Sequence, residues 1–191
     1  LIAIFVLLLV LVFGLYFLYQ NIPGSPVDLN PVIIKEPVLE NKTYLEVKQF
    51  YPNMKFNHNR IAYYIDPLCD SEKRERMLEA FDKLIFLVGF IEFYEVDGGL
   101  YDIEVSCSGE IAEFSSDEYF IAGEGGAREI IRTNRYSIIR NGTVILHGNP
   151  TSSLECGWAN VELHELIHVL GFQHSEDPKS LMYPILEDCD Q

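Results

Sequence analysis

The chain begins with an unbroken apolar run. Residues 1–19 are all apolar or aromatic except for Gly14. A helix of this length extends about 28 Å at ~1.5 Å per residue, close to the ~30 Å hydrocarbon core of a bilayer. Tyr16, Phe17 and Tyr19 end the run, and aromatic residues favour the membrane interface. We therefore expect an uncleaved transmembrane signal-anchor. The alternatives are a cleaved signal peptide and a buried core helix.

The next segment, residues 20–45, is a linker that contains prolines. Proline removes a backbone hydrogen-bond donor and favours extended chain over helix. The prolines concerned are Pro23, Pro26, Pro31 and Pro37. We expect a stalk between the membrane and a domain that spans residues 46–191. The alternative is a first strand near residues 32–34 that packs on this domain.

The first elements expected in the domain are a strand and a helix. Arg60–Ile65 is rich in β-branched and aromatic residues, which indicates a strand. Asp70 or Ser71 then caps a helix that ends at Gly89. Apolar residues recur there at helical spacing, namely Met77, Phe81, Leu84, Ile85 and Val88. One face of this helix is therefore expected to pack on the sheet.

Four more strands and a second helix are expected after it. The strands fall over residues 91–96, 101–107, 128–140 and 143–147. Asn141-Gly142 separates the last two and favours a hairpin turn, and Gly123-Glu124-Gly125-Gly126 indicates a flexible turn. The second helix covers residues 158–170. The order strand, helix, four strands, helix predicts an α/β sheet with helices packed on it.

The charge of the chain is strongly acidic and unevenly placed. Its 191 residues include 14 Lys plus Arg and 29 Asp plus Glu, giving a net charge of −15 and a pI near 4.6. We expect no nucleic-acid partner, because phosphate binding needs clustered basic residues. No charged residue precedes Asp28. The acidic residues that follow the apolar run fit an exported carboxyl-terminal domain, so we expect an extracytoplasmic location.

Four cysteines point to an oxidising compartment. Cys69, Cys107, Cys156 and Cys189 are widely separated, with no C-x-x-C pair. Behind an export signal, two disulfides are the natural interpretation, and three connectivities are allowed. We favour Cys69 with Cys107 and Cys156 with Cys189, because the first pair ends two strands and the second brackets a histidine-rich segment. Four reduced thiols in a cytosolic protein are the alternative.

The histidine-rich segment carries the chemistry. His164 and His168 lie four residues apart on the second helix, so both imidazoles project from one face and can share an ion. A catalytic zinc takes three protein ligands and keeps a fourth position for water. Gly171 can adopt positive φ, end the helix and turn the chain so that His174 returns to the ion. We expect one Zn²⁺ bound by the three histidines.

Glu165 is the candidate catalytic residue. It follows the first ligand and can reach a metal-activated water without binding the metal, so it can act as general base in peptide hydrolysis. Three His, one Glu and one Gly at these fixed positions arise by chance on the order of 10⁻⁵ times per chain. The alternative, histidines that pack without metal, is correspondingly disfavoured.

These residues carry a family resemblance. His164, Glu165, His168, Gly171 and His174 match the metzincin signature, and the segment Leu181-Met182-Tyr183-Pro184 resembles the matrixin branch. The resemblance implies a zinc-dependent endopeptidase with protein or peptide substrates. It also implies a twisted, mostly parallel five-stranded sheet with an antiparallel edge strand, an active-site helix and a second packed helix. In this fold Met182 forms the turn beneath the metal.

The resemblance also raises expectations beyond the metal ligands. By element order, the strand over residues 128–140 would be the sheet edge that pairs with an extended substrate. Many matrixins bind a second, structural zinc through further histidines. Only His58 and His147 remain outside the motif, so we expect a single zinc. The chain stops seven residues after Pro184, where the family continues into a third helix, so we expect a longer natural domain.

Two other functions remain open at this stage. One is a membrane-anchored adhesion domain that keeps a structural zinc, although an intact Glu165 argues against it. The other is a cytosolic metallopeptidase whose apolar run is a buried helix. Residues 151–191 hold eight acidic residues, but no spaced oxygen-ligand loop supports Ca²⁺ binding.

Overall fold

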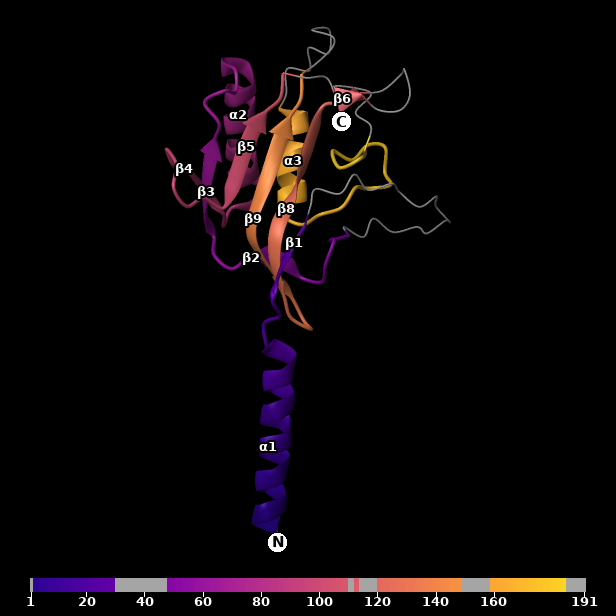
Figure 1. Ribbon diagram of the computed structural model, residues 1–191. Coiled ribbons are helices and arrows are strands. Elements are labelled where there is room, and N and C mark those ends of the chain that lie inside the picture. The colour runs from indigo at the N-terminus through magenta and orange to yellow at the C-terminus, as the bar shows by residue number, and fades with distance from the viewer. Residues whose placement is uncertain (1, 30–47, 110–111, 114–119, 149–158, 185–191) are drawn as a thin grey trace.

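The computed structural model describes residues 2–29, 48–109, 112–113, 120–148 and 159–184 (Figure 1). A sheet forms the centre of the domain, and helices α2 (Ser71–Val88) and α3 (Asn160–Val169) pack together on one of its faces. Helix α1 (Ile2–Asn21) extends away from the domain. The expected α/β class with helices packed on a sheet is therefore confirmed.

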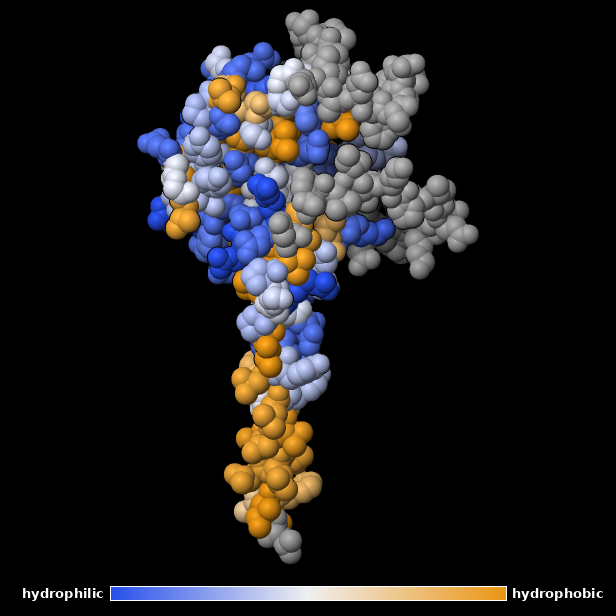
Figure 2. Space-filling model, in the orientation of Figure 1, coloured by the Kyte–Doolittle hydropathy of each residue, from blue (hydrophilic) through white to orange (hydrophobic). Residues whose placement is uncertain are grey.

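Helix α1 has the length and composition of a membrane span. It covers 20 residues without a charged side chain, and none of its side chains is buried in the domain. Figure 2 shows it as an apolar column below a largely hydrophilic domain. Because none of its residues is buried, α1 is not a core helix of the described domain. A signal sequence would have the same properties.

Seven strands of the described chain form the main sheet. Six follow the order β1-β8-β9-β5-β3-β4, and β2 pairs with β9. Their bounds are β1 Pro26–Asp28, β2 Met54–Phe56, β3 Arg60–Ile65, β4 Glu92–Glu95, β5 Ile103–Cys107, β8 Gly123–Arg132 and β9 Ser137–Leu146. β2, β3, β4, β5 and β9 run parallel to one another, whereas β8 is antiparallel to both of its neighbours, β9 and β1. A separate pair joins β6 (Ala112–Glu113) and β7 (Phe120–Ile121).

Helix α2 begins and ends as its sequence predicts. The Asp70 side chain accepts a hydrogen bond from the Lys73 backbone at 2.9 Å, and Gly89 closes the helix with φ 75°. Phe81 is buried between the rings of Tyr63 and Phe93, at centroid distances of 4.1 and 4.8 Å. Glycine adopts the left-handed backbone at Gly89 without steric cost. The sequence therefore predicts both ends of α2, with Asp70 at its start and Gly89 at its end.

A disulfide joins Cys69 and Cys107, one of the two pairs favoured from the sequence. It ties the loop that precedes α2 to the end of β5. The other expected pair, Cys156 with Cys189, lies outside the described residues.

The predicted hairpin at Asn141-Gly142 is wrong. Both residues lie inside β9, and the turn falls at residues 133–136, where the Thr133 hydroxyl accepts hydrogen bonds from the Arg135 and Tyr136 backbones. A Cβ on Gly142 would lie 2.5 Å from Val169 Cγ1 of α3. This glycine therefore permits close packing of helix on strand, which is the other common use of glycine in a strand.

Strand β1 lies in the segment expected to be a free stalk. It pairs with β8 from Pro26↔Ile131 to Asp28↔Glu129, and the Gly24 amide donates to the Arg132 carbonyl at 2.8 Å. The chain is therefore hydrogen-bonded to the sheet from Gly24 onward, three positions after α1 ends at Asn21. The alternative first strand near residues 32–34 lies outside the described residues.

Candidate metal centre

Helix α3 packs against β8 at very short range. A Cβ on Gly125 would lie 2.3 Å from the Glu165 carbonyl oxygen, and one on Gly123 would lie 2.9 Å from Glu165 Cγ. Any larger residue at these two positions would push the helix away. The flexible turn predicted for residues 123–126 is therefore wrong, because these glycines belong to β8 and let the strand approach the helix.

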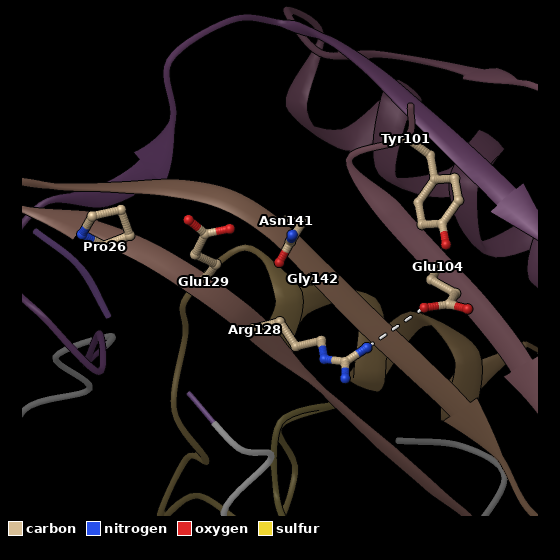
Figure 3. A pocket seen from close by; sticks show the side chains of 7 residues that line it. All are labelled: Pro26, Tyr101, Glu104, Arg128, Glu129, Asn141 and Gly142. Carbon is tan, nitrogen blue, oxygen red and sulfur yellow. Dashed lines mark ion pairs between the residues drawn. The ribbon is translucent and has the colours of Figure 1, made fainter. Parts of the chain in front are cut away.

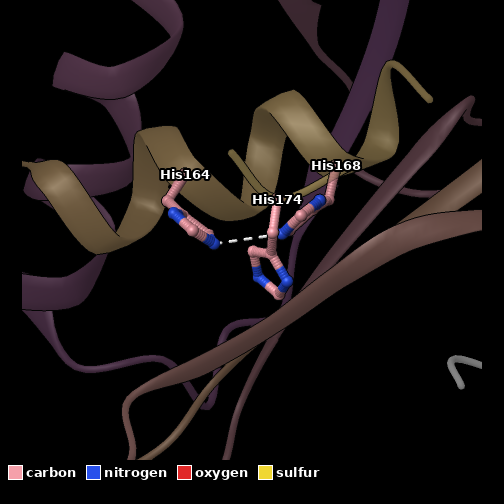
Figure 4. A group of neighbouring side chains, drawn as sticks. All are labelled: His164, His168 and His174. Atoms are coloured by element: carbon pink, nitrogen blue, oxygen red, sulfur yellow. Dashed lines mark hydrogen bonds between the residues drawn. The ribbon is translucent and has the colours of Figure 1, made fainter. Parts of the chain in front are cut away.

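Three histidines converge beside this contact. His164 and His168 lie one turn apart on α3, His174 returns from the following loop, and one ring nitrogen of each lies within 4.8 Å of the others (Figure 4). The Nε2 atoms of His164 and His168 are 3.0 Å apart. A tetrahedral zinc with Zn–N bonds of ~2.0–2.1 Å separates its ligand nitrogens by roughly 3.3 Å. The cluster therefore fits one zinc ion.

Backbone carbonyls orient the two helical imidazoles. His164 Nδ1 lies 2.7 Å from the Leu181 oxygen, and His168 Nδ1 lies 2.7 Å from the Phe172 oxygen. A carbonyl oxygen can only accept, so each Nδ1 carries the proton and each Nε2 keeps its lone pair. This second layer of contacts fixes the tautomer that a metal requires.

Burial keeps all three imidazoles neutral. It lowers the pKa of His164 to about 3 and the pKa of His174 to about 4, with a smaller contribution in each case from a neighbouring histidine. Burial also lowers the pKa of His168. Neutral imidazole is the form that binds metal, so the site keeps its lone pairs well below neutral pH.

Glu165 is buried on the same helix, 7% exposed, against the glycine end of β8. Burial raises the pKa of its carboxyl group to about 8, with further contributions from the carboxylates of Glu124 and Glu162. A cation held by the adjacent histidines favours the ionised form. A carboxyl group balanced between these influences can accept and release a proton near neutral pH.

The loop after α3 has the turn that the sequence predicts at Gly171. This glycine has φ 95°, and its amide donates to the His168 carbonyl at 2.9 Å. Met182 is 9% exposed, and its carbonyl accepts the Ser175 amide at 2.7 Å. Together with the bond from His164 to Leu181, this places the segment around Met182 next to the cluster.

Within the described residues, no second group of three metal-binding side chains occurs. His58 pairs with Asp102 at 3.3 Å, and His147 pairs with Glu124 at 2.8 Å. The Glu124–His147 pair was not predicted from the sequence, since 23 residues separate its members and only the pairing of β8 with β9 brings them together.

A pocket of about 390 Å³ lies on the opposite face of the sheet from α3 (Figure 3). Arg128 and Glu104 form an ion pair across it at 3.6 Å. None of the three clustered histidines lines this pocket, so it is separate from the metal centre.

Comparison with known proteins agrees with this geometry. The family model for matrixin, of the peptidase M10 type, matches residues 55–191. The match covers most of the sheet, α2, α3 and the histidine cluster. Comparison with curated proteins gives no match.

Proposed function

The chain belongs to the matrixin family and is a metalloendopeptidase, and from this premise we propose how it binds metal and cleaves its substrate. His164, His168 and His174 hold one catalytic zinc, and Glu165 is the general base. The observation that carries the proposal is the convergence of three neutral imidazoles beside a buried carboxyl group. A bound zinc ion supplies Lewis acidity, which polarises the peptide carbonyl and acidifies water at the site.

Glu165 performs the proton transfers in this proposal. Its carboxylate takes a proton from the attacking water and later delivers it to the leaving amine. The buried position against β8 excludes bulk water from the carboxyl group. Met182 and Gly171 contribute by shape, since the turn at Gly171 returns His174 and the segment around Met182 supports His164.

The substrate is a protein or peptide, and we propose that it binds along β8. Within the part of the chain that the structure describes, β1 and the hydrogen bonds that flank it cover the outer edge of β8 only at residues 128–132. The outer edge of residues 123–127 carries no partner strand there, and this stretch contacts the helix at Glu165. An extended peptide added at this edge would lie beside the catalytic residue. The proposed edge is therefore β8, which shares only residues 128–132 with the strand over residues 128–140 expected from the sequence.

We also propose that α1 anchors the enzyme in a membrane with the catalytic domain outside the cytoplasm. The length and apolar composition of α1 and the Cys69–Cys107 disulfide support this location. Flotation with liposomes and protease protection of the full chain test it. A mature protein that lacks residues 2–21 would identify α1 as a cleaved signal peptide.

The Glu165→Gln variant tests the chemical roles. It should bind zinc in a one-to-one ratio and lose peptide hydrolysis by at least about a thousandfold. Glu92→Gln, a change on exposed β4, is the matched control and should keep full activity. Undiminished hydrolysis by Glu165→Gln would overturn the role of Glu165.

The rival function, an adhesion domain with a structural zinc, requires a closed fourth position on the metal. The described cluster supplies three ligands and no fourth His, Cys, Asp or Glu. Incubation of the full chain with a peptide library, with and without a chelator, separates the two functions, because an adhesion domain would cut nothing.

A further inference from the structure

One end of the domain lies beside α1. It is formed by residues 51–55 and 132–136, which we call the basal surface. The Asn53 amide donates to the Arg135 carbonyl at 2.8 Å, and the Arg132 guanidinium stacks over the Tyr51 ring at 4.7 Å. These contacts join the two segments into one surface. The turn between β8 and β9 points toward α1 in Figure 1.

The chain keeps the basal surface close to the end of α1. Gly24, whose amide binds the Arg132 carbonyl at 2.8 Å, lies only three positions after Asn21, the last residue of the helix. Three extended residues reach at most about 10 Å. The polar layer of a bilayer adds roughly 5–8 Å outside each side of its hydrocarbon core. A membrane that contains α1 therefore brings Arg132 to the level of the lipid headgroups.

The charge of the basal surface is opposite to that of the chain. Lys55, Arg132 and Arg135 are exposed on it, and no carboxylate of the described residues pairs with any of them. The sequence contains no Asp or Glu over residues 48–65 or 130–148, although the chain has 29 acidic residues. Figure 2 shows hydrophilic side chains where the apolar column meets the domain. The two segments of the basal surface therefore carry basic residues and no acidic ones, and the nearest acidic positions of the described sheet are Asp28 and Glu129, further along β1 and β8.

We propose that the basal surface binds anionic phospholipid headgroups of the membrane that α1 spans. The inference rests on the proposed anchor, and it adds a second attachment that fixes how the domain stands on the bilayer. Basic residues near an anionic surface are attracted by its negative potential, and each contributes on the order of fivefold to the binding equilibrium. Three such residues therefore contribute on the order of a hundredfold.

The docked orientation also fixes the distance between the proposed metal centre and the lipid headgroups. Strand β8 runs nearly in line with α1 (Figure 1), from the glycines beside Glu165 to Arg132 at the basal surface. Arg132 lies seven positions after Gly125, which is about 23 Å at ~3.3 Å per residue. Docking would hold the proposed active site about 20 Å outside the headgroups.

The test uses the full chain with a fluorophore on Asn134→Cys, at the exposed tip of the β8–β9 turn. The protein is reconstituted in liposomes of phosphatidylcholine alone or with 30% phosphatidylglycerol, each with a headgroup-linked quencher. Because α1 already keeps this turn near the bilayer, some quenching is expected in both lipids. We expect additional quenching with the anionic lipid, and loss of that additional quenching in about 0.5 M NaCl, where screening shortens the range of charge attraction to a few ångströms.

The triple variant Lys55→Gln, Arg132→Gln, Arg135→Gln should lose this additional quenching. Its control, Lys73→Gln, Lys83→Gln, Lys179→Gln, removes the same charge elsewhere and should keep it. Equal quenching in both lipids, or additional quenching that survives in the basal triple variant, would overturn the proposal. Flotation reports separately on the anchor, and hydrolysis of a soluble peptide reports on folding and catalysis, so failure of either is distinguishable from failure of lipid docking.

Discussion

The two ends of β8 have opposite compositions and opposite surroundings. At its start, glycines bring the backbone against α3, next to Glu165 and the three histidines. At its end, Arg132 is exposed and the strand is covered by β1. Gly123 and Gly125 at the first end leave no room for a side chain because a helix lies against them, whereas Arg132 at the second end is exposed. One strand thus connects the proposed catalytic end with the proposed attachment end, and variants can change each end without the other.

The largest effect is expected from a metal ligand at the catalytic end. His168→Ala removes one of the three proposed ligands, so bound zinc and peptide hydrolysis should both fall, the latter by at least about a thousandfold. Metal analysis and hydrolysis of a soluble peptide measure the two effects. His58→Ala, at a histidine paired with Asp102, is the control and should leave both unchanged. The basal triple variant should also keep both.

Gly125→Ala should have the next largest effect. Its Cβ would lie 2.3 Å from the Glu165 carbonyl oxygen, so the strand and α3 must separate, at a cost of about 3 kcal/mol or more. Urea denaturation measures the change. Gly126→Ala is the matched control, since a Cβ there meets nothing within 4 Å. Equal stability of the two variants would show that the close approach is not required.

The metal-free catalytic end should also be sensitive to acid. The folded pKa values of His164 and His174 are about 3 and 4, below the ordinary value of ~6.5. The unfolded chain therefore takes up protons below pH 6.5 while the folded chain does not, so stability falls from pH 6.5 to about 4. Glu165 acts in the other sense, because its raised pKa makes the folded state lose stability as pH rises toward 8.

Urea denaturation in chelator at several pH values tests this dependence. The Glu165→Gln background removes the opposing contribution, so the loss toward acid should become steeper between pH 6.5 and 4.5. Substitution of His174 by Gln should flatten it. A profile that stays level below pH 6.5 would contradict neutral, buried imidazoles.

The smallest effect is expected from the distance between the cleaved bond of a tethered peptide and the lipid headgroups. Peptides tethered to the same liposomes should be cut several times faster when the bond lies about 20 Å from the headgroups, roughly six extended residues, than when it lies close to the surface. The basal triple variant should lose this preference while cutting soluble peptides normally. A rate independent of tether length in the unmodified enzyme would argue against a fixed height.

Local signals predicted much of the fold. The capping residue Asp70 and the terminal Gly89 mark α2 because both act within one turn of the chain. The spacing of His164, His168 and His174 predicted their convergence because helix and turn geometry are also local. Those features could be derived without knowing what packs against them.

The errors arose where a distant segment decides the structure. The local sequences around Gly125 and Gly142 are typical of turns. Each glycine nevertheless lies in a strand, because α3 approaches it closely. Strand β1 was not predicted, since its pairing depends on the exposed edge of β8, about 100 residues further along the chain. The hydrophobic periodicity of a segment does not indicate which distant segments pack against it.

Strand β1 also gives the attachment a mechanical property. Hydrogen bonds from Gly24 and Leu29 flank its pairing with β8, and α1 continues along nearly the same line (Figure 1). A force that pulls the domain away from the bilayer would load these bonds in shear, all at once, instead of opening them one after another. The junction should therefore resist tension along the axis of α1 and yield more easily to a force across it.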